Sequence, residues 1–336
     1  MGWSTWWHFK VMRRCVVMEE QVNQEKRSVR YSLVIPVYNS ETIVGETVDR
    51  IVAFFEAQGW DYELILVNDG SNDCSWDVLR AKALDNPHLL AINLLRNYGQ
   101  HSAILCGLQN STGDYVITLD DDLQNPPEEM MRLINKAHEG HDLVFGRFHE
   151  KKHSWHRRAG SLLIGKLNER LFDKPKTLVV SNFRILRRDV VDRICSYRTG
   201  YPYVSGLALM FSANPSNTWV AHQERAAGKS QYDFIKLAQL VMRILFNYSS
   251  YPLHLVSFVG LAISGCSLLL GLYYLGKGLA GGVSVPGWVS LVLLLLFLNG
   301  IIILILSMLG EYTVRILNQT SSTESYQVRE IVGRPV

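Results

Sequence analysis

The stretch YVITLDDDLQ at residues 115–124 decides the fold, because an apolar, β-branched run leads directly into an acidic turn. On an extended backbone the side chains of Asp120 and Asp122 project to one face and that of Asp121 to the other. Two carboxylates on one face, with the amide oxygen of Gln124 nearby, form an oxygen-rich site suited to Mg²⁺ or Mn²⁺. The simpler alternative is an acidic turn that caps the following helix, which accounts well for Asp121 alone.

Short apolar runs recur on both sides of this stretch and alternate with helical patterns. Each run is bounded by Gly, Asn, Asp or Pro. The alternation of strand and helix predicts an α/β fold with a mostly parallel, Rossmann-like sheet covered by helices. Ligands of such sheets bind beyond the carboxyl ends of the strands. The runs lie at residues 31–37, 62–67, 89–95, 115–120 and 142–146.

Two turns follow the first two runs and bring further groups to the same edge of the sheet. PVYN at 36–39 places Tyr38 where an aromatic face can stack on a base, and NDGS at 68–71 places Asp69 where a carboxylate can accept hydrogen bonds from a base or ribose. Asn, Asp, Gly and Ser are also ordinary turn formers, so a purely structural role is the alternative for each turn. Their convergence with the acidic turn favours a binding site.

The composition excludes several classes of protein. The chain has 336 residues, 48% of them hydrophobic, and its formal net charge of +3 is too small to indicate a nucleic-acid partner, which needs a concentrated basic face. Its five cysteines are scattered without CxxC spacing, so they indicate neither a disulfide framework nor a zinc site. We therefore expect a reducing, cytoplasmic compartment for the soluble part.

The N-terminal extension, residues 1–30, lacks the uninterrupted apolar core of a signal peptide. Its aromatic residues, among them Trp3, Trp6 and Trp7, leave two interpretations open. The extension is either dispensable or an aromatic contact with a membrane surface.

Two long apolar stretches near the C-terminus, 253–275 and 288–311, are each long enough to cross a hydrocarbon core of roughly 30 Å. The Gly-rich link between them carries a single charge, Lys277, whereas Arg243 precedes the pair and Arg315 follows it. The positive-inside rule therefore predicts a transmembrane helical hairpin, with the soluble domain and both termini in the cytoplasm.

Two amphipathic stretches, about 157–172 and 230–250, precede the first apolar segment. Each carries an apolar stripe with interspersed Lys and Arg. They are either surface helices that pack on the core or helices that lie in the membrane interface, and the adjoining apolar segment suits the second interpretation.

Five blocks, in their order along the chain, resemble those of inverting family-2 glycosyltransferases with the GT-A fold. The subgroup that they resemble is the dolichol-phosphate-mannose-synthase-like polyprenyl-phosphate glycosyltransferases, in particular the bacterial enzymes with two transmembrane helices. The blocks are PVYN at 36–39, VNDGS at 67–71, RNYGQ at 96–100, DDDLQNPP at 120–127 and GR at 146–147.

Two later segments extend the resemblance over nearly the whole chain. ERAAGKSQY at 224–232 is similar to the flexible acceptor loop of that subgroup, and GEY at 310–312 is similar to the end of its second transmembrane helix. Gln231 stands where relatives commonly have Lys, and we expect Lys229 to replace that cation.

The resemblance implies a role for several groups of residues. The implied donor-binding residues are Pro36, Tyr38, Asn39, Asp69, Ser71, Arg96 and Asp120. The implied acceptor-phosphate residues are Arg147, Arg157, Arg158, Arg225, Lys229, Ser230 and Tyr232. The metal ligands are Asp120, Asp122 and Gln124, and the catalytic residues are Asp120, Asp122, Arg147 and Arg225.

These inferences divide the chain into five parts. The parts are the extension (1–30), a GT-A catalytic domain (31–229), an amphipathic interfacial helix (230–250), two transmembrane helices (251–312) and a cytoplasmic tail (313–336). The expected partners are a nucleotide-sugar, a polyprenyl phosphate such as undecaprenyl phosphate, the inner membrane and a second copy of the chain in a homo-oligomer.

The resemblance implies transfer of a sugar onto the lipid phosphate with Mg²⁺ or Mn²⁺, and we favour glucose from UDP-glucose, with GDP-mannose or another UDP-sugar as alternatives. A catalytically degenerate, nucleotide-sugar-binding membrane scaffold is the alternative of another class. A dehydrogenase is excluded because no GxGxxG follows a strand, and a processive polysaccharide synthase because no QxxRW block occurs. A phosphate monoester with a second pKa of about 6 is largely dianionic near neutral pH, so we assign no histidine as a general base.

Overall fold

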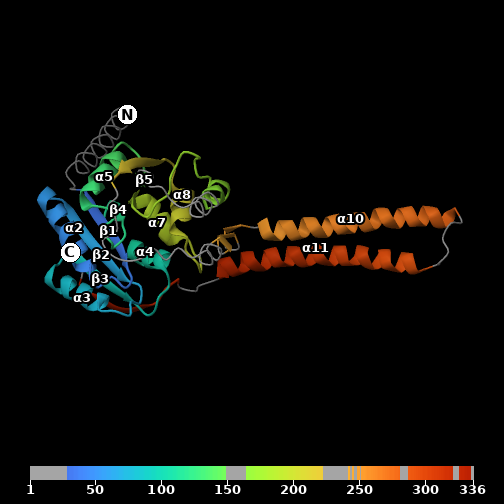
Figure 1. Ribbon diagram of the computed structural model, residues 1–336, viewed down its shortest axis with the longest axis horizontal. Coiled ribbons are helices and arrows are strands. Elements are labelled where there is room, and N and C mark those ends of the chain that lie inside the picture. Colours follow the sequence, from blue (N-terminus) through green and yellow to red (C-terminus); the bar gives the residue numbers. More distant parts are fainter. Residues whose placement is uncertain are drawn as a thin grey trace, which may run out of the picture.

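The computed structural model contains an eight-stranded mixed sheet with helices on both faces and a long helical hairpin that projects from it (Figure 1). The strand order is β7-β5-β6-β4-β1-β2-β3-β8. The structure describes residues 29–148, 164–221, 241–242, 244–245, 248–249, 251–280, 287–320 and 325–333.

The five strands expected from the apolar runs are β1 to β5, so the predicted α/β sheet is confirmed. β1 pairs in parallel with both β2 and β4, and β2 pairs in parallel with β3, whereas β6 is antiparallel to its neighbours β4 and β5. The strands are β1 (Arg30–Val37), β2 (Asp61–Asn68), β3 (Leu89–Leu94), β4 (Tyr115–Thr118), β5 (Leu143–Phe148), β6 (Arg184–Arg187), β7 (Pro215–Val220) and β8 (Val328–Val332). The carboxyl ends of β1 to β4 therefore share one edge.

Alternating side chains of the strands build one core layer on each face of the sheet. On one face the apolar side chains pack against α4, α7 and α8, and on the other against α2, α3 and α5. Burial of each large aliphatic side chain contributes about 1.5–3 kcal/mol. These helices are α2 (Val44–Gln58), α3 (Ser75–Asp85), α4 (Gln100–Gln109), α5 (Met130–His138), α7 (Arg188–Ser196) and α8 (Val204–Phe211), with the short 3₁₀ helix η1 (Pro127–Glu129) before α5.

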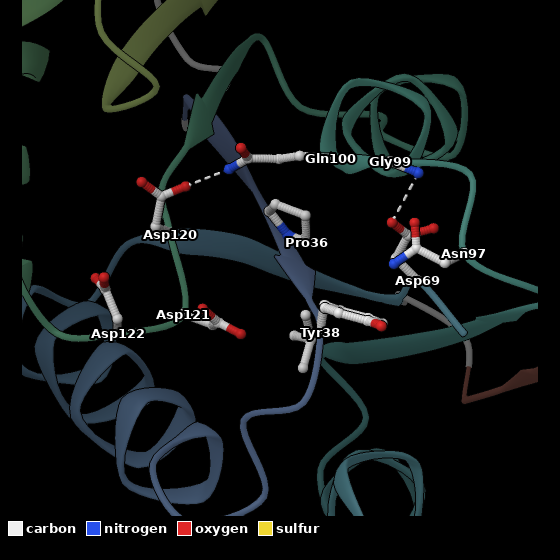
Figure 2. Close-up of a pocket in the computed structure, with 10 residues that line it drawn as sticks. Pro36, Tyr38, Asp69, Asn97, Gly99, Gln100, Asp120, Asp121 and Asp122 are labelled. Atoms are coloured by element: carbon white, nitrogen blue, oxygen red, sulfur yellow. Dashed lines mark hydrogen bonds between the residues drawn. The ribbon is translucent and has the colours of Figure 1, made fainter. Parts of the chain in front are cut away.

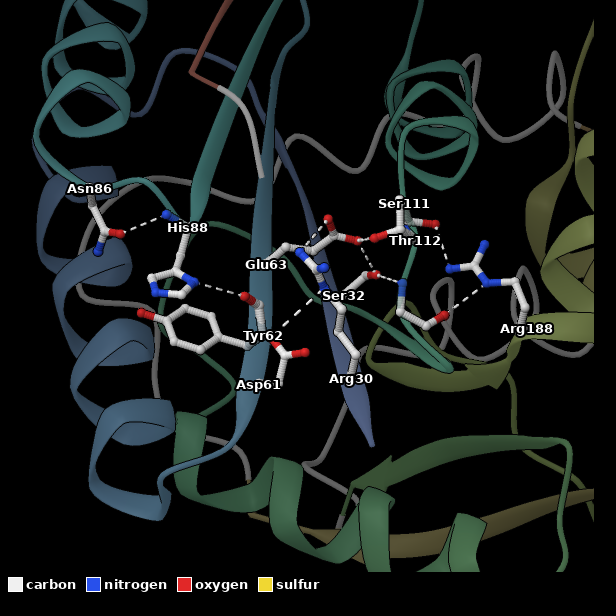
Figure 3. Close-up of polar contacts among 11 residues, drawn as sticks. Arg30, Ser32, Asp61, Tyr62, Glu63, Asn86, His88, Ser111, Thr112 and Arg188 are labelled. Atoms are coloured by element: carbon white, nitrogen blue, oxygen red, sulfur yellow. Dashed lines mark hydrogen bonds and ion pairs between the residues drawn. The ribbon is translucent and has the colours of Figure 1, made fainter. Parts of the chain in front are cut away.

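The opposite, amino-terminal edge of the sheet is closed by a buried carboxylate, Glu63 (Figure 3). Glu63 Oε1 accepts hydrogen bonds from Ser32 Oγ at 2.6 Å and from the backbone N–H of Thr112 at 2.6 Å. Its second oxygen lies 3.5 Å from Arg30 Nη2. The side chain thus links β1, β2 and the turn before β4.

The hairpin consists of α10 (Tyr251–Leu279) and α11 (Trp288–Thr320), which lie side by side (Figure 1). Each contains a window apolar enough to span a bilayer, and only 12% of each window is buried, which is too little for the core helices of a soluble domain. A Cβ on Gly300 would lie 2.5 Å from Cβ of Ser264, so small residues let the two helices approach closely.

The described parts of the two amphipathic stretches pack on the core of the sheet domain. Leu167 and Leu171 lie against the apolar cluster under α8, Phe172 is buried in it, and so is Ile244 of the second stretch. These contacts favour surface helices for the described residues; residues 157–163 and 230–240 lie outside them.

The expected cytoplasmic tail contains a strand that the sequence did not predict. β8 pairs antiparallel with β3 and covers the edge of the sheet (Figure 1). β8 thereby becomes the edge strand on this side of the sheet, and its shortness and its charged residues Arg329 and Glu330 hinder pairing with another chain. The chain that leaves the hairpin therefore returns to the domain that precedes the hairpin.

Candidate active site

The turns after β1 and β2 are tied together by their polar side chains. The backbone N–H of Asn39 donates to Ser71 Oγ at 3.0 Å, and the N–H of Asn72 donates to Asn39 Oδ1 at 2.9 Å. Asn39 has a φ of 52°, a left-handed conformation that Asn tolerates better than most residues. Asn39 and Ser71 hold the two turns and leave Tyr38 at the edge, with 45% of its surface exposed.

Asp69 fixes the loop between β3 and α4. Its two carboxylate oxygens accept the backbone N–H groups of Tyr98 at 2.7 Å and Gly99 at 2.9 Å. Burial raises the pKa of Asp69 to about 6, and the two backbone hydrogen bonds oppose that rise. The carboxylate thus shapes the RNYGQ block, and its contact with a base or ribose stays a prediction.

Gly70 lets the turn after β2 approach the same loop. It has a φ of 63°, and a Cβ there would lie 2.4 Å from the backbone carbonyl carbon of Arg96. Any other residue would push Arg96 and Asn97 away, so the NDGS turn requires glycine at its third position.

The acidic turn after β4 has the alternation expected from the sequence. Asp120 and Asp122 lie on one side, whereas Asp121 points toward Tyr38 (Figure 2). Gln100 Nε2 donates to Asp120 Oδ1 at 2.5 Å, and Asn182 Nδ2 lies 3.5 Å from the same oxygen. These neutral amides orient the carboxylate without neutralising its charge.

Electrostatics in this turn favour a bound cation. Burial, and after it the charges of Asp122 and Asp121, raise the pKa of Asp120 to about 6. Burial also raises the pKa of Asp121, against a hydrogen bond from Ser40. A divalent cation would relieve the repulsion, so Asp120 and Asp122 fit a metal.

The protein alone supplies a small number of ligands for such a metal. Within the described part of the chain, no three His, Cys, Asp or Glu side chains form a metal-binding group. Mg²⁺ and Mn²⁺ sites are commonly completed by substrate phosphates and water. The role of Gln124 as a ligand stays a prediction.

Two adjoining cavities connect these groups. The first, of about 370 Å³, contains the acidic turn, and the second, of about 480 Å³, shares Tyr38 and Asn97 with it. Of the expected donor-binding residues, Pro36, Tyr38, Asp69 and Asp120 line the first cavity, and Tyr38, Ser71 and Arg96 line the second.

The expected acceptor cations are only partly described. Arg147 lies near the carboxyl end of β5, with its guanidinium 4.4 Å from the centre of the Trp219 ring on β7. It belongs to neither of these two cavities. The other expected acceptor-phosphate residues, Arg157, Arg158, Arg225, Lys229, Ser230 and Tyr232, lie outside the described residues.

Three polar residues beside Asp120 were missed by the sequence analysis. Gln100 stands in the RNYGQ block, which could have pointed to it. Arg184 is the first residue of β6, and Asn182 lies two residues before it. Arg184 is opposite Thr118 of β4, two residues before Asp120. Only the pairing of distant strands brings Asn182 and Arg184 here, so no local pattern indicates them.

Comparison with known proteins decides the family. Residues 32–195 match the family model described as glycosyl transferase family 2. Over 307 residues the chain is 36% identical to the undecaprenyl-phosphate 4-deoxy-4-formamido-L-arabinose transferase of Proteus mirabilis (strain HI4320), with 90% of this chain and 94% of that protein covered. The chain belongs to glycosyl transferase family 2.

Two further comparisons agree with this family assignment. This family-2 glycosyltransferase is 31% identical over 308 residues to an uncharacterized glycosyltransferase of Bacillus subtilis (strain 168), with 91% of this chain and 95% of that protein covered. Mannosyl-3-phosphoglycerate synthase from Rubrobacter xylanophilus shares the fold, with a TM-score of 0.50, 17% identity, and 65% of this chain and 72% of that chain covered. The predicted GT-A-like sheet of a family-2 glycosyltransferase is confirmed.

Proposed function

We propose that this glycosyltransferase transfers a sugar from a nucleotide-sugar to undecaprenyl phosphate, with inversion at the anomeric carbon, at the cytoplasmic face of the inner membrane. The observation that carries the proposal is the single cavity in which the acidic turn meets Tyr38 and Asp69. The acceptor follows from the Proteus mirabilis relative, whose name states undecaprenyl phosphate, and from the apolar hairpin beside the domain.

On the donor side, the loops at the strand ends bind and orient the nucleotide-sugar. Asp69 holds the Tyr98–Gly99 backbone in place, and Gln100 holds the Asp120 carboxylate. Asp120 and Asp122, with Gln124, would bind Mg²⁺ or Mn²⁺, and the cation would supply positive charge against the negative charge of the departing nucleoside diphosphate. Because these groups are already oriented, little reorganisation is needed as that charge develops.

On the acceptor side, the lipid phosphate is itself the nucleophile. Near neutral pH it is largely dianionic, because its second pKa is about 6, and no side chain has to remove a proton from it. The enzyme's task is to align a phosphate oxygen with the anomeric carbon, which supplies the entropic part of the rate. We assign phosphate binding to Arg147, Arg157, Arg158, Arg225 and Lys229, with Ser230 and Tyr232, since Arg binds phosphate oxygens bidentately.

The donor sugar has several candidates. Glucose from UDP-glucose is the sequence-based prediction, with GDP-mannose or another UDP-sugar as alternatives. 4-Deoxy-4-formamido-L-arabinose is favoured by the name of the relative that is 36% identical. All of these donors need similar phosphate contacts, and a few hydroxyl or formamido partners discriminate among them.

A panel of radiolabelled donors tests the proposal. The purified chain is incubated in detergent with undecaprenyl phosphate and each donor, with Mn²⁺, Mg²⁺ or a chelator. We expect metal-dependent transfer of one sugar to the lipid. No transfer with any donor would support the degenerate scaffold instead.

Substitution of Asp122 tests the site. Asp122→Asn should lower kcat by a factor of about 10²–10³, the usual effect of losing one charge-stabilising group. The matched control is Glu128→Gln, an exposed carboxylate of η1 outside the cavity, which should retain the wild-type rate. Wild-type rates from Asp122→Asn would exclude Asp122 as a metal ligand.

A further inference from the structure

The second cavity lies on the side of Tyr38 away from the acidic turn. Tyr38 and Asn97 line both cavities, and Figure 2 places Asn97 and Asp69 across Tyr38 from Asp122. In the proposed function, the diphosphate of the donor lies at the acidic turn. The nucleoside then extends past Tyr38, and its base is the part that reaches the second cavity.

The C-terminal strand supplies one wall of this cavity through Arg329. β8 pairs Glu330 with Asn93 and Val328 with Leu94, so Arg329 is the extra residue of a β-bulge. A bulge turns a side chain away from the regular alternation of its strand and is common beside functional sites. Here Glu330 faces α3 and lies 3.6 Å from Arg80, whereas Arg329 faces the cavity.

The chemistry of the cavity suits a nucleobase better than a second anionic group. The cations Arg96 and Arg329 face it, but so do the carboxylates Asp73 and Asp77, and Trp76 adds an aromatic surface. Two carboxylates would repel a polyanion. A neutral, planar base tolerates neighbouring charges of both signs, stacks on aromatic rings, and offers carbonyl oxygens to a guanidinium.

We propose that Arg329, carried by the bulge of β8, completes the base-binding end of the donor site by donating a hydrogen bond to a carbonyl oxygen of the nucleobase. The inference rests on the proposed function, because it needs a nucleotide-linked donor in the first cavity. It gives the C-terminal strand a part in recognition of the nucleotide. Arg329 is a specificity residue, since it touches the base and not the reacting atoms.

The test is nucleotide binding by the full chain in detergent with Mn²⁺ present. UDP, GDP and inorganic pyrophosphate are titrated calorimetrically into the wild type, Arg329→Ala and Arg329→Lys. We expect Arg329→Ala to weaken the preferred nucleotide about tenfold, as for loss of one hydrogen bond from a charged donor, and to leave pyrophosphate affinity unchanged. Arg329→Lys should recover part of the loss.

Arg80→Ala is the matched control, because Arg80 contacts the same strand from the opposite face. It should leave nucleotide affinity unchanged, and thermal unfolding checks that every variant is folded. Unchanged nucleotide affinity in Arg329→Ala would overturn the inference about Arg329 and leave the proposed function standing. An equal loss in Arg80→Ala, or an equal loss of pyrophosphate binding, would also overturn it. A wild type that binds neither nucleotide would overturn the proposed function as well.

Discussion

The residues around Asp120 carry charges that burial makes costly. Arg184 is fully buried, and desolvation lowers its pKa to about 10, an effect that the nearby Tyr203 hydroxyl and Asp120 carboxyl groups oppose. The guanidinium therefore stays charged at neutral pH. Burial and the charge of Arg184 lower the pKa of His101 to about 3, so this imidazole is neutral there. With so low a pKa, His101 is a weak base near neutral pH.

Asp69 makes the stability of the fold depend on pH. Its pKa is about 6 in the folded chain, against 3.8 for an unperturbed carboxyl, so the folded state binds the proton more tightly. This group therefore stabilises the fold most at pH below about 4, and that contribution is lost as the pH rises through about 6. The ionised form is nevertheless the one that accepts both N–H groups of the Tyr98–Gly99 loop.

We predict that the KM for the donor rises as the pH falls through about 6, because a protonated Asp69 cannot accept both hydrogen bonds and the loop loosens. Asp69→Asn should have a raised KM with little pH dependence. The measurement is donor KM from pH 5 to 8, at saturating Mn²⁺ so that Asp120 stays ionised. Asp114→Asn, at the opposite edge of the sheet, should keep the wild-type profile. If Asp69→Asn kept the wild-type pH profile of the donor KM, the pH dependence would belong to another group.

At the scale of elements, polar links between strands decide the geometry of both edges of the sheet. Glu63 ties β1, β2 and the turn before β4 together at the edge away from the site (Figure 3). Its loss would remove the acceptor of Ser32 and of the Thr112 backbone N–H. It would also remove one of the two carboxylates beside the partly buried Arg30, which keeps Asp61. Each unsatisfied buried group costs about 1–3 kcal/mol.

Glu63→Ala should therefore lower the free energy of unfolding by about 3 kcal/mol, since several donors lose one acceptor. Thermal unfolding in detergent measures the loss, and the rate per folded molecule should stay close to that of the wild type because the site lies at the other edge. Glu56→Ala, on the exposed face of α2, is the control and should change stability little. Equal stability of Glu63→Ala and Glu56→Ala would show that the hydrogen bonds of Glu63 contribute nothing to the free energy of unfolding.

The elements that the sequence predicted are those with a local signal. β1 to β5 follow from apolar runs ended by turn residues, and the acidic turn follows from three adjacent aspartates. β8 has charged residues at two of its five positions, and only its partner β3 makes it a strand. Asn182 reaches Asp120 for the same reason, because β6 pairs with β4 across many intervening residues. Long-range pairing leaves no local pattern to recognise.

At the scale of the whole molecule, the two ends of the hairpin are held by one domain. Before α10, Tyr248 Oη donates to the backbone oxygen of Tyr201 at 3.0 Å, and after α11, Ser325 Oγ donates to the backbone oxygen of Thr199 at 2.7 Å. β8 then pairs with β3. Both ends of the hairpin must therefore lie on the same side of any membrane that the hairpin crosses, which agrees with the positive-inside rule.

This constraint predicts the outcome of cysteine labelling in intact cells. Single cysteines are compared at Cys74 on the domain, at Ala280→Cys in the link after α10, and at Gln327→Cys beside β8, with the other cysteines replaced. We expect a membrane-impermeant maleimide to react with Ala280→Cys in intact cells and with the other two only after permeabilisation, because β8 cannot pair with β3 across a bilayer. Labelling of Gln327→Cys from outside, with Cys74 still protected, would contradict the shared attachment of the hairpin. Equal labelling of all three in intact cells would contradict the membrane-spanning hairpin itself.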